Sequence, residues 1–439
     1  MSAQATEPKV QGHSAGVVAD QRSLHWCVEA SIEEAGVLYE TLQEQLCGDA
    51  ATFSDIRMLC DRLDAHLDVL RIAGAQAWSL LDVQLASPNT GLIFTATVLS
   101  LEQRQSRRLK ALIALAEADA MLSAALLYAF GWVPATVTAP LVTPMLGASV
   151  PYYQRIGLYL CRQHQVPADT ALERAITTPD RTVQLLALDV IGETGALDLL
   201  PYCQQRLTAE DCAVRFAACR ASLMLGERTR SLPLLMQWAT KPSPQQKAAL
   251  ALLTVFLPVT QAQSFLATVG RNTPDRRLLV QLAGKLGDPA NIPALLRLMP
   301  DPLLGRIAGH AFSIITGADL VAFNLERPAP ADVTVGPNDD PGDDNVDSDM
   351  DDALPWPDVA KVSHWWAQHC GRFVAGQRYL AGNAITVEQC LQVLQQGDQL
   401  QRHAAALHLK ALNPASPLFT VDAPAWRQKA RLASMIATL

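Results

Sequence analysis

Signals for the start of a helix recur about every 30 residues, and this spacing constrains the fold more than any other feature of the sequence. A side chain that can cap a helix precedes a proline in Thr178-Pro179, Ser243-Pro244, Thr273-Pro274 and Asp301-Pro302, and Thr208 provides a fifth start without proline. The capping oxygen accepts a free backbone N–H, and proline at the first position gives up a donor that has no partner there. The five starts are 30, 35, 30 and 28 residues apart. A period of this length predicts a repeat protein.

A second marker keeps the same rhythm. A basic residue stands eleven residues before a glycine in four pairs, Arg181 and Gly192, Arg215 and Gly226, Arg276 and Gly287, and Arg306 and Gly317, while Lys247 has Pro258 in place of glycine. Apolar helical segments such as VQLLALDVI and LLVQLAGKL lie between the two markers, and a glycine after such a segment usually ends the helix. Each unit then holds two short helices, which bury their apolar faces only by stacking on neighbouring units. The sequence therefore predicts an all-α solenoid of helical hairpins.

The order of basic residue, Ala/Leu-rich helix and glycine resembles HEAT repeats, especially the short HEAT-like units of phycobilisome lyases. A second resemblance rests on GQRYLAGNAIT at 376–386, DQLQRHAAALHLKALNP at 398–414, PLFTVDAPAWRQ at 417–428 and RLDAHLDVLRIAG at 62–74. These segments are similar to a bacterial family of HEAT-repeat proteins whose members are often encoded beside type VI secretion components. The resemblance implies a cytoplasmic accessory role, in effector handling or in protection from an effector. It carries over no catalytic residues.

The chain is expected to divide into five parts. They are a disordered N-terminus (1–22), a helical N-terminal cap (23–116), the HEAT-like repeat array (117–325), an acidic linker rich in proline and aspartate (326–356), and a helical C-terminal region with one repeat-like helix (357–439). An array must cover its exposed ends, so atypical terminal helices are expected. The linker holds five prolines and almost nothing that builds a core, which predicts disorder.

Charge and cysteine content narrow the function classes. Eight of the 43 acidic residues are aspartates between Asp339 and Asp352, and the rest of the chain has 35 residues of each sign. A near-neutral body argues against nucleic acid as the main partner, since phosphate binding needs clustered Lys and Arg. The nine cysteines include no CxxC pair and are expected to be free thiols.

The segment 120–154 has no charged residue but does not predict membrane insertion. Its longest uninterrupted apolar run ends at Val133, and prolines interrupt the rest. A membrane span needs roughly 20 apolar residues. We expect a buried helix followed by a proline-rich turn.

The basic ladder, comprising Arg181, Arg215, Lys247, Arg276 and Arg306, has two interpretations. It forms a row for an anion or a partner on the inner face, or it ties neighbouring repeats together by hydrogen bonds. The structural interpretation is favoured, because the forked guanidinium group suits interfacial pairing. The glycines Gly192, Gly226, Gly287 and Gly317 complete this structural set.

Two further sets of residues are candidates for partner binding. The aspartates Asp343, Asp344, Asp347 and Asp349 suit a basic partner, although a solvated, self-repelling linker is the favoured interpretation. A calcium loop is disfavoured, because Ser348 and Leu354 replace the glycine and glutamate that such a loop needs. The aromatic residues Trp365, Trp366, Tyr379 and Trp426 resemble binding hot spots, but a small terminal domain also needs them for its core.

No catalytic, metal or cofactor site is expected. The pairs His364/His369 and His403/His408 are five residues apart, which places neither pair on one helix face. The sequence has no GxSxG, HExxH or glycine-rich phosphate loop. The leading hypothesis is a non-catalytic scaffold that binds another protein. Alternatives are a tetrapyrrole lyase or isomerase, suggested by the lyase-type repeats, and a nucleic-acid-binding helical-repeat protein.

Overall fold

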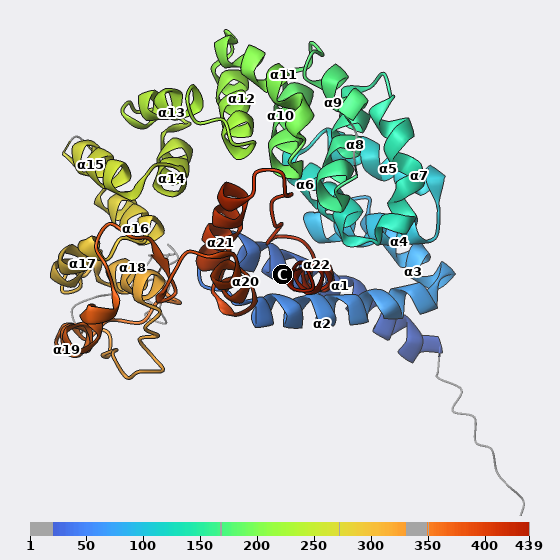
Figure 1. The fold of residues 1–439 in the computed structure, drawn as a ribbon. Coiled ribbons are helices and arrows are strands. Elements are labelled where there is room, and N and C mark those ends of the chain that lie inside the picture. The colour runs from blue at the N-terminus through green and yellow to red at the C-terminus, as the bar shows by residue number, and fades with distance from the viewer. Residues whose placement is uncertain (1–20, 167–168, 272, 331–348, 350, 439) are drawn as a thin grey trace, which may run out of the picture.

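The computed structural model describes residues 21–166, 169–271, 273–330, 349 and 351–438. The described chain forms an arc of α-helices, and its C-terminal helices lie inside the arc (Figure 1). The architecture is an all-α solenoid, as the repeat spacing predicts.

Five helices precede the array. They are α1 (Gln21–Cys47), α2 (Phe53–Ala73), α3 (Ala75–Gln84), α4 (Thr90–Glu102) and α5 (Ser106–Glu117). Helices α1 and α2 pack against each other as a long antiparallel pair, and α4 connects them to the array through α6. A capping box starts α2, in which the Asp55 N–H donates to the Thr52 hydroxyl and the Thr52 N–H donates to the Asp55 carboxylate.

The array contains two rows of helices. The inner row is α6 (Ala120–Trp132), α8 (Pro151–His164), α10 (Arg181–Thr194), α12 (Cys212–Met224), α14 (Gln246–Phe256), α16 (Arg276–Leu286) and α18 (Gly305–Thr316). The outer row is α7 (Ala135–Leu146), α9 (Asp169–Ala175), α11 (Leu200–Gln205), α13 (Ser231–Ala239), α15 (Val259–Gly270) and α17 (Ile292–Leu298). Short 3₁₀ segments precede α11 and α17 at Leu197–Leu199 and Pro289–Asn291, and another follows α11 at Arg206–Thr208. Neighbouring helices of the inner row contact one another in succession, apart from α12 and α14, which α13 connects.

All five predicted helix starts are shifted by two or three residues, because the inner helices begin after Asp180, Asp211, Gln245, Asp275 and Leu304. Asp180, Asp211 and Asp275 cap α10, α12 and α16, and each accepts a hydrogen bond from a backbone N–H of the first turn. Thr178-Pro179 and Thr273-Pro274 therefore lie outside the helices, and Thr208 lies in the 3₁₀ segment before α12. Aspartate is a strong cap because its carboxylate also suits the positive end of the helix dipole.

The expectation that Gly192 ends a helix is wrong. Helix α10 continues to Thr194, and Gly195 ends it with a left-handed φ of 78°. Gly192 instead allows a close helix crossing, since a Cβ placed on it would lie 2.8 Å from the Ala221 Cα. Three glycines do stand in left-handed conformations after their helices, Gly226, Gly287 and Gly317.

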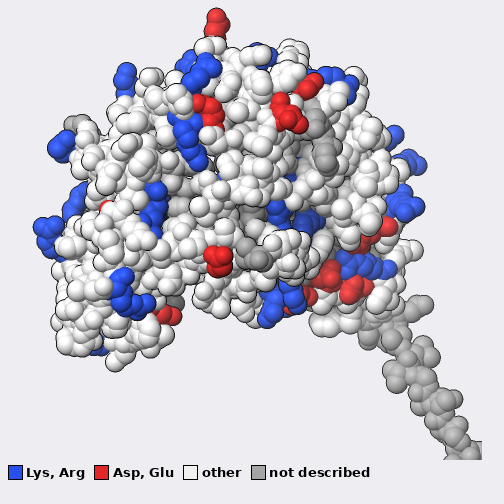
Figure 2. Space-filling view, in the orientation of Figure 1, with Lys and Arg blue, Asp and Glu red and all other residues white. Residues whose placement is uncertain are grey.

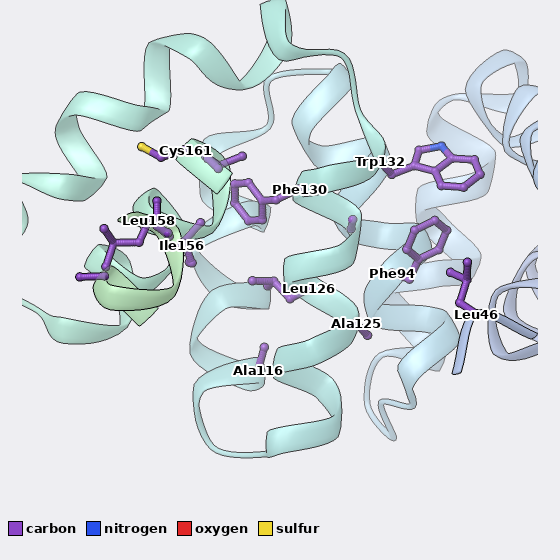
Figure 3. Close-up of a cluster of buried hydrophobic side chains, with 14 of the residues drawn as sticks. Leu46, Phe94, Ala116, Ala125, Leu126, Phe130, Trp132, Ile156, Leu158 and Cys161 are labelled. Carbon is purple, nitrogen blue, oxygen red and sulfur yellow. The ribbon is translucent and has the colours of Figure 1, made fainter. Parts of the chain in front are cut away.

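One hydrophobic core joins the N-terminal helices to the array. Phe94 of α4 packs edge-on against Trp132 of α6, with ring centroids 5.5 Å apart. Figure 3 shows this contact and, on the other side of α6, Leu126 and Phe130 beside Ile156 and Leu158 of α8. The proline-rich turn expected after Val133 is wrong, because α7 includes Pro140 and Pro144. The described helices include none that is both long and apolar enough to cross a membrane.

The C-terminal region fills the inside of the arc. Helix α19 (Val359–His369), with a 3₁₀ turn at Cys370–Arg372, covers the far end of the array, and a two-stranded hairpin follows as β1 (Tyr379–Leu380) and β2 (Asn383–Ala384). Helices α20 (Val387–Gln396), α21 (Gln399–Leu412) and α22 (Ala425–Ile436) lie in the middle of the arc (Figure 1). Helix α21 contacts α14, while α20 and α22 contact α2. The two terminal parts therefore meet and close the arc.

The expectation of a disordered linker over 326–356 is wrong for its described residues. Glu326 and Pro357 form a β-bridge, and the Arg327 N–H donates to the Trp356 carbonyl at 2.8 Å. Asp351 and Trp356 are buried. The rest of this segment and residues 1–20 lie outside the described residues, as do Asp343, Asp344 and Asp347.

Candidate functional site

Three of the five members of the basic ladder tie their repeat to the next one. Arg181 Nε lies 2.7 Å from an Asp211 carboxylate oxygen, and Lys247 Nζ lies 3.5 Å from Asp275. Arg276 reaches Asp301 at 3.6 Å in the same way. Each cation thus meets an aspartate at the start of the following unit. These groups are largely exposed, and exposed pairs contribute about 0–1 kcal/mol each. The ladder fixes register more than it adds stability.

Two members of the ladder depart from this pattern. Arg215 meets no aspartate at the start of the following unit, because Gln245 stands before α14. Its guanidinium instead donates to the Ala209 carbonyl at 2.9 Å and lies over the Trp238 ring. Arg306 is buried, pairs with Asp349 at 2.5 Å and lies over the Trp356 ring at 4.7 Å.

The described end of the acidic stretch is bound by the array. Arg277 Nη1 donates to Asp351 at 2.7 Å, and Arg306 Nη1 donates to the Asp351 carbonyl at 2.9 Å. The side chain of Asp351 is only 6% exposed. Asp349 and Asp351 therefore act as internal counter-ions of the last repeat and do not project as a free acidic surface.

The inner side of the solenoid is bound by the chain's own C-terminal region. The Tyr379 N–H donates to the Gly287 carbonyl at 2.9 Å, and the Ala381 N–H donates to the Ile314 carbonyl at 2.7 Å. The Leu418 N–H donates to the Glu193 carbonyl at 2.7 Å. All three acceptors lie at the ends of inner helices, where carbonyls have no partner within the helix.

Two partly buried arginines of the C-terminal region donate side-chain hydrogen bonds to carbonyls at the ends of other inner helices. Arg378 donates to the Thr254 carbonyl at 3.1 Å and Arg427 to the Val133 carbonyl at 3.2 Å, at the ends of α14 and α6. Burial lowers the pKa of both arginines to about 10, and neither has a carboxylate partner among the described residues. Sequence reasoning missed both residues. The only sequence feature that pointed to them is that they lie in the segments 376–386 and 417–428, on which the family resemblance rests.

The glycines of the ladder leave room for the C-terminal region to lie close to the ends of the inner helices. A Cβ on Gly287 would lie 2.3 Å from the Tyr379 carbonyl oxygen, and one on Gly317 would lie 2.6 Å from that of Ala381. The corresponding neighbour of Gly226 is Pro414, at 3.3 Å. The glycines that end the inner helices therefore also receive the C-terminal region. The concave side, where helical arrays usually hold partners, is covered along the described chain.

A buried polar network connects α8, α10 and α12. Arg162 Nε lies 2.5 Å from Glu193, and Arg220 lies 2.6 Å from Asp189 and 3.5 Å from Glu193. Burial raises the pKa of Glu193 above its ordinary value, and the two arginines oppose that rise. Since the network is closed on itself, we interpret it as structural.

The four aromatic candidates separate into two groups. Tyr379 is buried, and Trp366 packs on Phe312 at 6.3 Å, so both belong to the core around α19. Trp365 also touches Phe312, at 5.7 Å, and it stacks with His369 at 4.1 Å and with Phe323 at 6.4 Å. Trp426 is 44% exposed and carries the Arg427 guanidinium over its ring.

Phe323 marks an exposed apolar site that the sequence did not reveal. Its side chain is 54% exposed, and Val321 beside it is 57% exposed. Together with Leu325, Ala360 and Trp365, Phe323 lines a groove of about 420 Å³ at the far end of the array.

Charged and metal-binding side chains do not gather into one site on the part of the chain that the structure describes. On the face shown in Figure 2, Lys and Arg are dispersed and interspersed with acidic residues. Among the described residues, no group of three His, Cys, Asp or Glu side chains is placed to hold a metal ion. His364 bonds Gln368 at 2.9 Å, whereas His408 is buried in α21.

Comparison with known proteins agrees with the repeat geometry. Residues 168–253 match the family model described as HEAT repeats. This segment extends from α9 into α14, within the array. No curated protein and no solved structure matches the chain significantly. The chain therefore carries HEAT repeats within an all-α solenoid.

Proposed function

We propose that this protein is a non-catalytic scaffold that binds another protein. The observation that carries the proposal is the stacked HEAT array itself, since such arrays present extended surfaces on a rigid frame. The C-terminal region covers the concave side, so the partner surface is assigned elsewhere on the array.

The exposed groove around Phe323 is the best-supported partner surface. Contiguous exposed apolar surface on a folded protein marks interaction sites, and aromatic anchors dominate binding energy. Phe323 and Trp365 supply such anchors on the last repeat and α19, and Lys361 borders the groove. The occupant is an apolar or aromatic side chain of a partner protein.

The cellular role proposed is that of a cytoplasmic adaptor or immunity protein in type VI secretion. Its support is the resemblance of segments 62–74, 376–386, 398–414 and 417–428 to a family encoded beside secretion components. The partner is then a secretion component or an effector.

Affinity purification of the tagged full-length protein from its native cells, followed by mass spectrometry, tests the proposal. Wild type should retain one protein in stoichiometric amount, and F323S should retain at least tenfold less, since a lost aromatic hot spot costs about 2 kcal/mol or more. The matched control is I72S, which alters an apolar residue 86% exposed on α2.

Three results bear on different parts of the proposal. A wild-type protein that retains no partner contradicts the scaffold function. Equal retention by F323S and I72S keeps the scaffold and removes the groove. A retained toxin whose killing the co-expressed protein prevents supports the immunity role, whereas unchanged killing opposes it.

A further inference from the structure

A pocket of about 480 Å³ lies where the C-terminal region meets the middle of the array. Its walls come from the end of α14, the start of α15, the hairpin segment 376–385 and the last turn of α21. Helices α14 and α21 are in contact, and the pocket lies beside their junction. Its volume is in the usual range of about 300–1,000 Å³ for small-molecule sites.

Two arginines line this pocket without a counter-ion among the described residues. Arg228 Nη1 donates to the Leu223 carbonyl at 3.2 Å, and Arg378 Nε donates to the Thr254 carbonyl at 3.1 Å. The Arg228 Nε and Nη2 groups and the Arg378 Nη1 group have no protein acceptor in the described chain. Burial lowers the pKa of both side chains, to about 10 for Arg378, because their charges are poorly solvated.

The nearest carboxylates are already engaged. Glu227 accepts hydrogen bonds from the Ser231 hydroxyl at 2.6 Å and from two backbone N–H groups. Asp288 accepts from the backbone N–H groups of Ala290 and Gly376, both at 3.0 Å. Neither carboxylate forms an ion pair with Arg228 or Arg378 within the described residues, so guanidinium N–H groups remain available to a ligand.

His408 adds a buried polar group without a partner. Its side chain is 5% exposed, lines the pocket and has no hydrogen bond or ion pair within the described residues. Burial, together with the charge of Arg378, lowers the pKa of His408 to about 3, so the ring is neutral. His408 lines the pocket, and its neutral ring offers one donor and one acceptor to a ligand.

We propose that this pocket binds a small organic anion, with a carboxylate or phosphate group held by Arg228 and Arg378. The forked guanidinium groups suit either anion. Val255, Phe256, Val259, Ile385 and Leu412 provide apolar walls, so the ligand also has an apolar body. The site is independent of the groove around Phe323.

Isothermal titration of the full-length protein with phenyl phosphate and hexanoate tests the site, with benzyl alcohol as the neutral probe. Wild type should bind at least one anion and not the alcohol. L412E places a carboxylate at the pocket wall and should weaken anion binding at least tenfold, whereas the isosteric L412Q should leave it unchanged. Leu412 is 51% exposed, so neither variant disturbs the core. R228Q should also weaken binding at least tenfold.

The proposal fails if neither anion binds wild type at millimolar concentration. It fails equally if L412E binds the anions as tightly as L412Q does, or if benzyl alcohol binds as well as phenyl phosphate. Circular dichroism verifies the fold of each variant, and if R228Q unfolds, the comparison of L412E with L412Q decides alone.

Discussion

Replacing Gly287 with alanine should detach the hairpin segment 376–385 from the repeats. Gly287 adopts a φ of 73°, where a residue with a Cβ is strained by about 1 kcal/mol. The added Cβ would also lie 2.3 Å from the Tyr379 carbonyl oxygen. Because carbon needs a separation of about 3.5 Å, the hairpin must retreat by roughly 1 Å.

That retreat breaks the hydrogen bond that Tyr379 N–H donates to the Gly287 carbonyl at 2.9 Å. The bond contributes about 1 kcal/mol, and leaving buried groups unpaired costs about 1–3 kcal/mol. We expect G287A to lose about 3 kcal/mol, of which about 2 kcal/mol belongs to the hairpin contact. Since 1.4 kcal/mol is tenfold, local opening of the hairpin should become about 30-fold more frequent.

Hydrogen exchange followed by mass spectrometry measures this opening directly. The matched control is G376A, because Gly376 has a φ of 83° but nothing within 4 Å of an added Cβ. It reports the backbone strain alone. If the amides of 379–382 exchange equally fast in G287A and G376A, the hairpin is not held by close packing on the repeat, and our reasoning about the inner glycines is refuted.

Three further variants test other contacts. R162M leaves the buried Glu193 beside only the more distant Arg220 and should lower the free energy of unfolding by about 3 kcal/mol. R276M breaks an exposed pair and should lower it by less than about 1 kcal/mol. The urea midpoints of the two variants measure this difference. Burial lowers the pKa of Lys410 to about 8, so between that pH and about 10 the unfolded chain binds more protons than the folded one. Wild-type stability should therefore rise over this range, and K410M should lack the rise in a denaturation series. D351N weakens the pair with Arg277 and should speed exchange of the amides of 351–357; unchanged exchange would show that the pair does not hold this segment.

The repeat array was predictable because its determinants are local. Helix caps, apolar periodicity and terminal glycines all act within one unit of about 30 residues, and the pairing of the ladder follows from that period. The error at Gly192 arose because α10 has one turn more than the register of the other units implies, and GETG offers two glycines for one helix end. Close packing on Ala221 decides between them, and that contact is not local.

The position of the C-terminal region was not predictable, because the contacts that hold it are also not local. Arg378 bonds carbonyls more than 100 positions away, and Arg427 bonds carbonyls nearly 300 positions away. Nothing in the composition of 376–386 or 417–428 identifies these acceptors. The acidic stretch was misread similarly, because its counter-ions Arg277 and Arg306 lie in the array. Aspartate density predicts disorder only where no buried cation meets it.

These contacts explain why the covered concave side is a specific docking surface. The ends of the inner helices present unpaired carbonyls and the negative end of the helix dipole, which favours cations by about 0.3–2 kcal/mol each. Arg378 and Arg427 deliver cations to two such ends, and the backbone N–H groups of Tyr379 and Ala381 serve two others. Any other occupant would have to supply equivalent donors at the same spacing. The inner side of the solenoid is therefore occupied by the C-terminal region of the same chain. For this reason we propose the apolar groove around Phe323 as the partner surface.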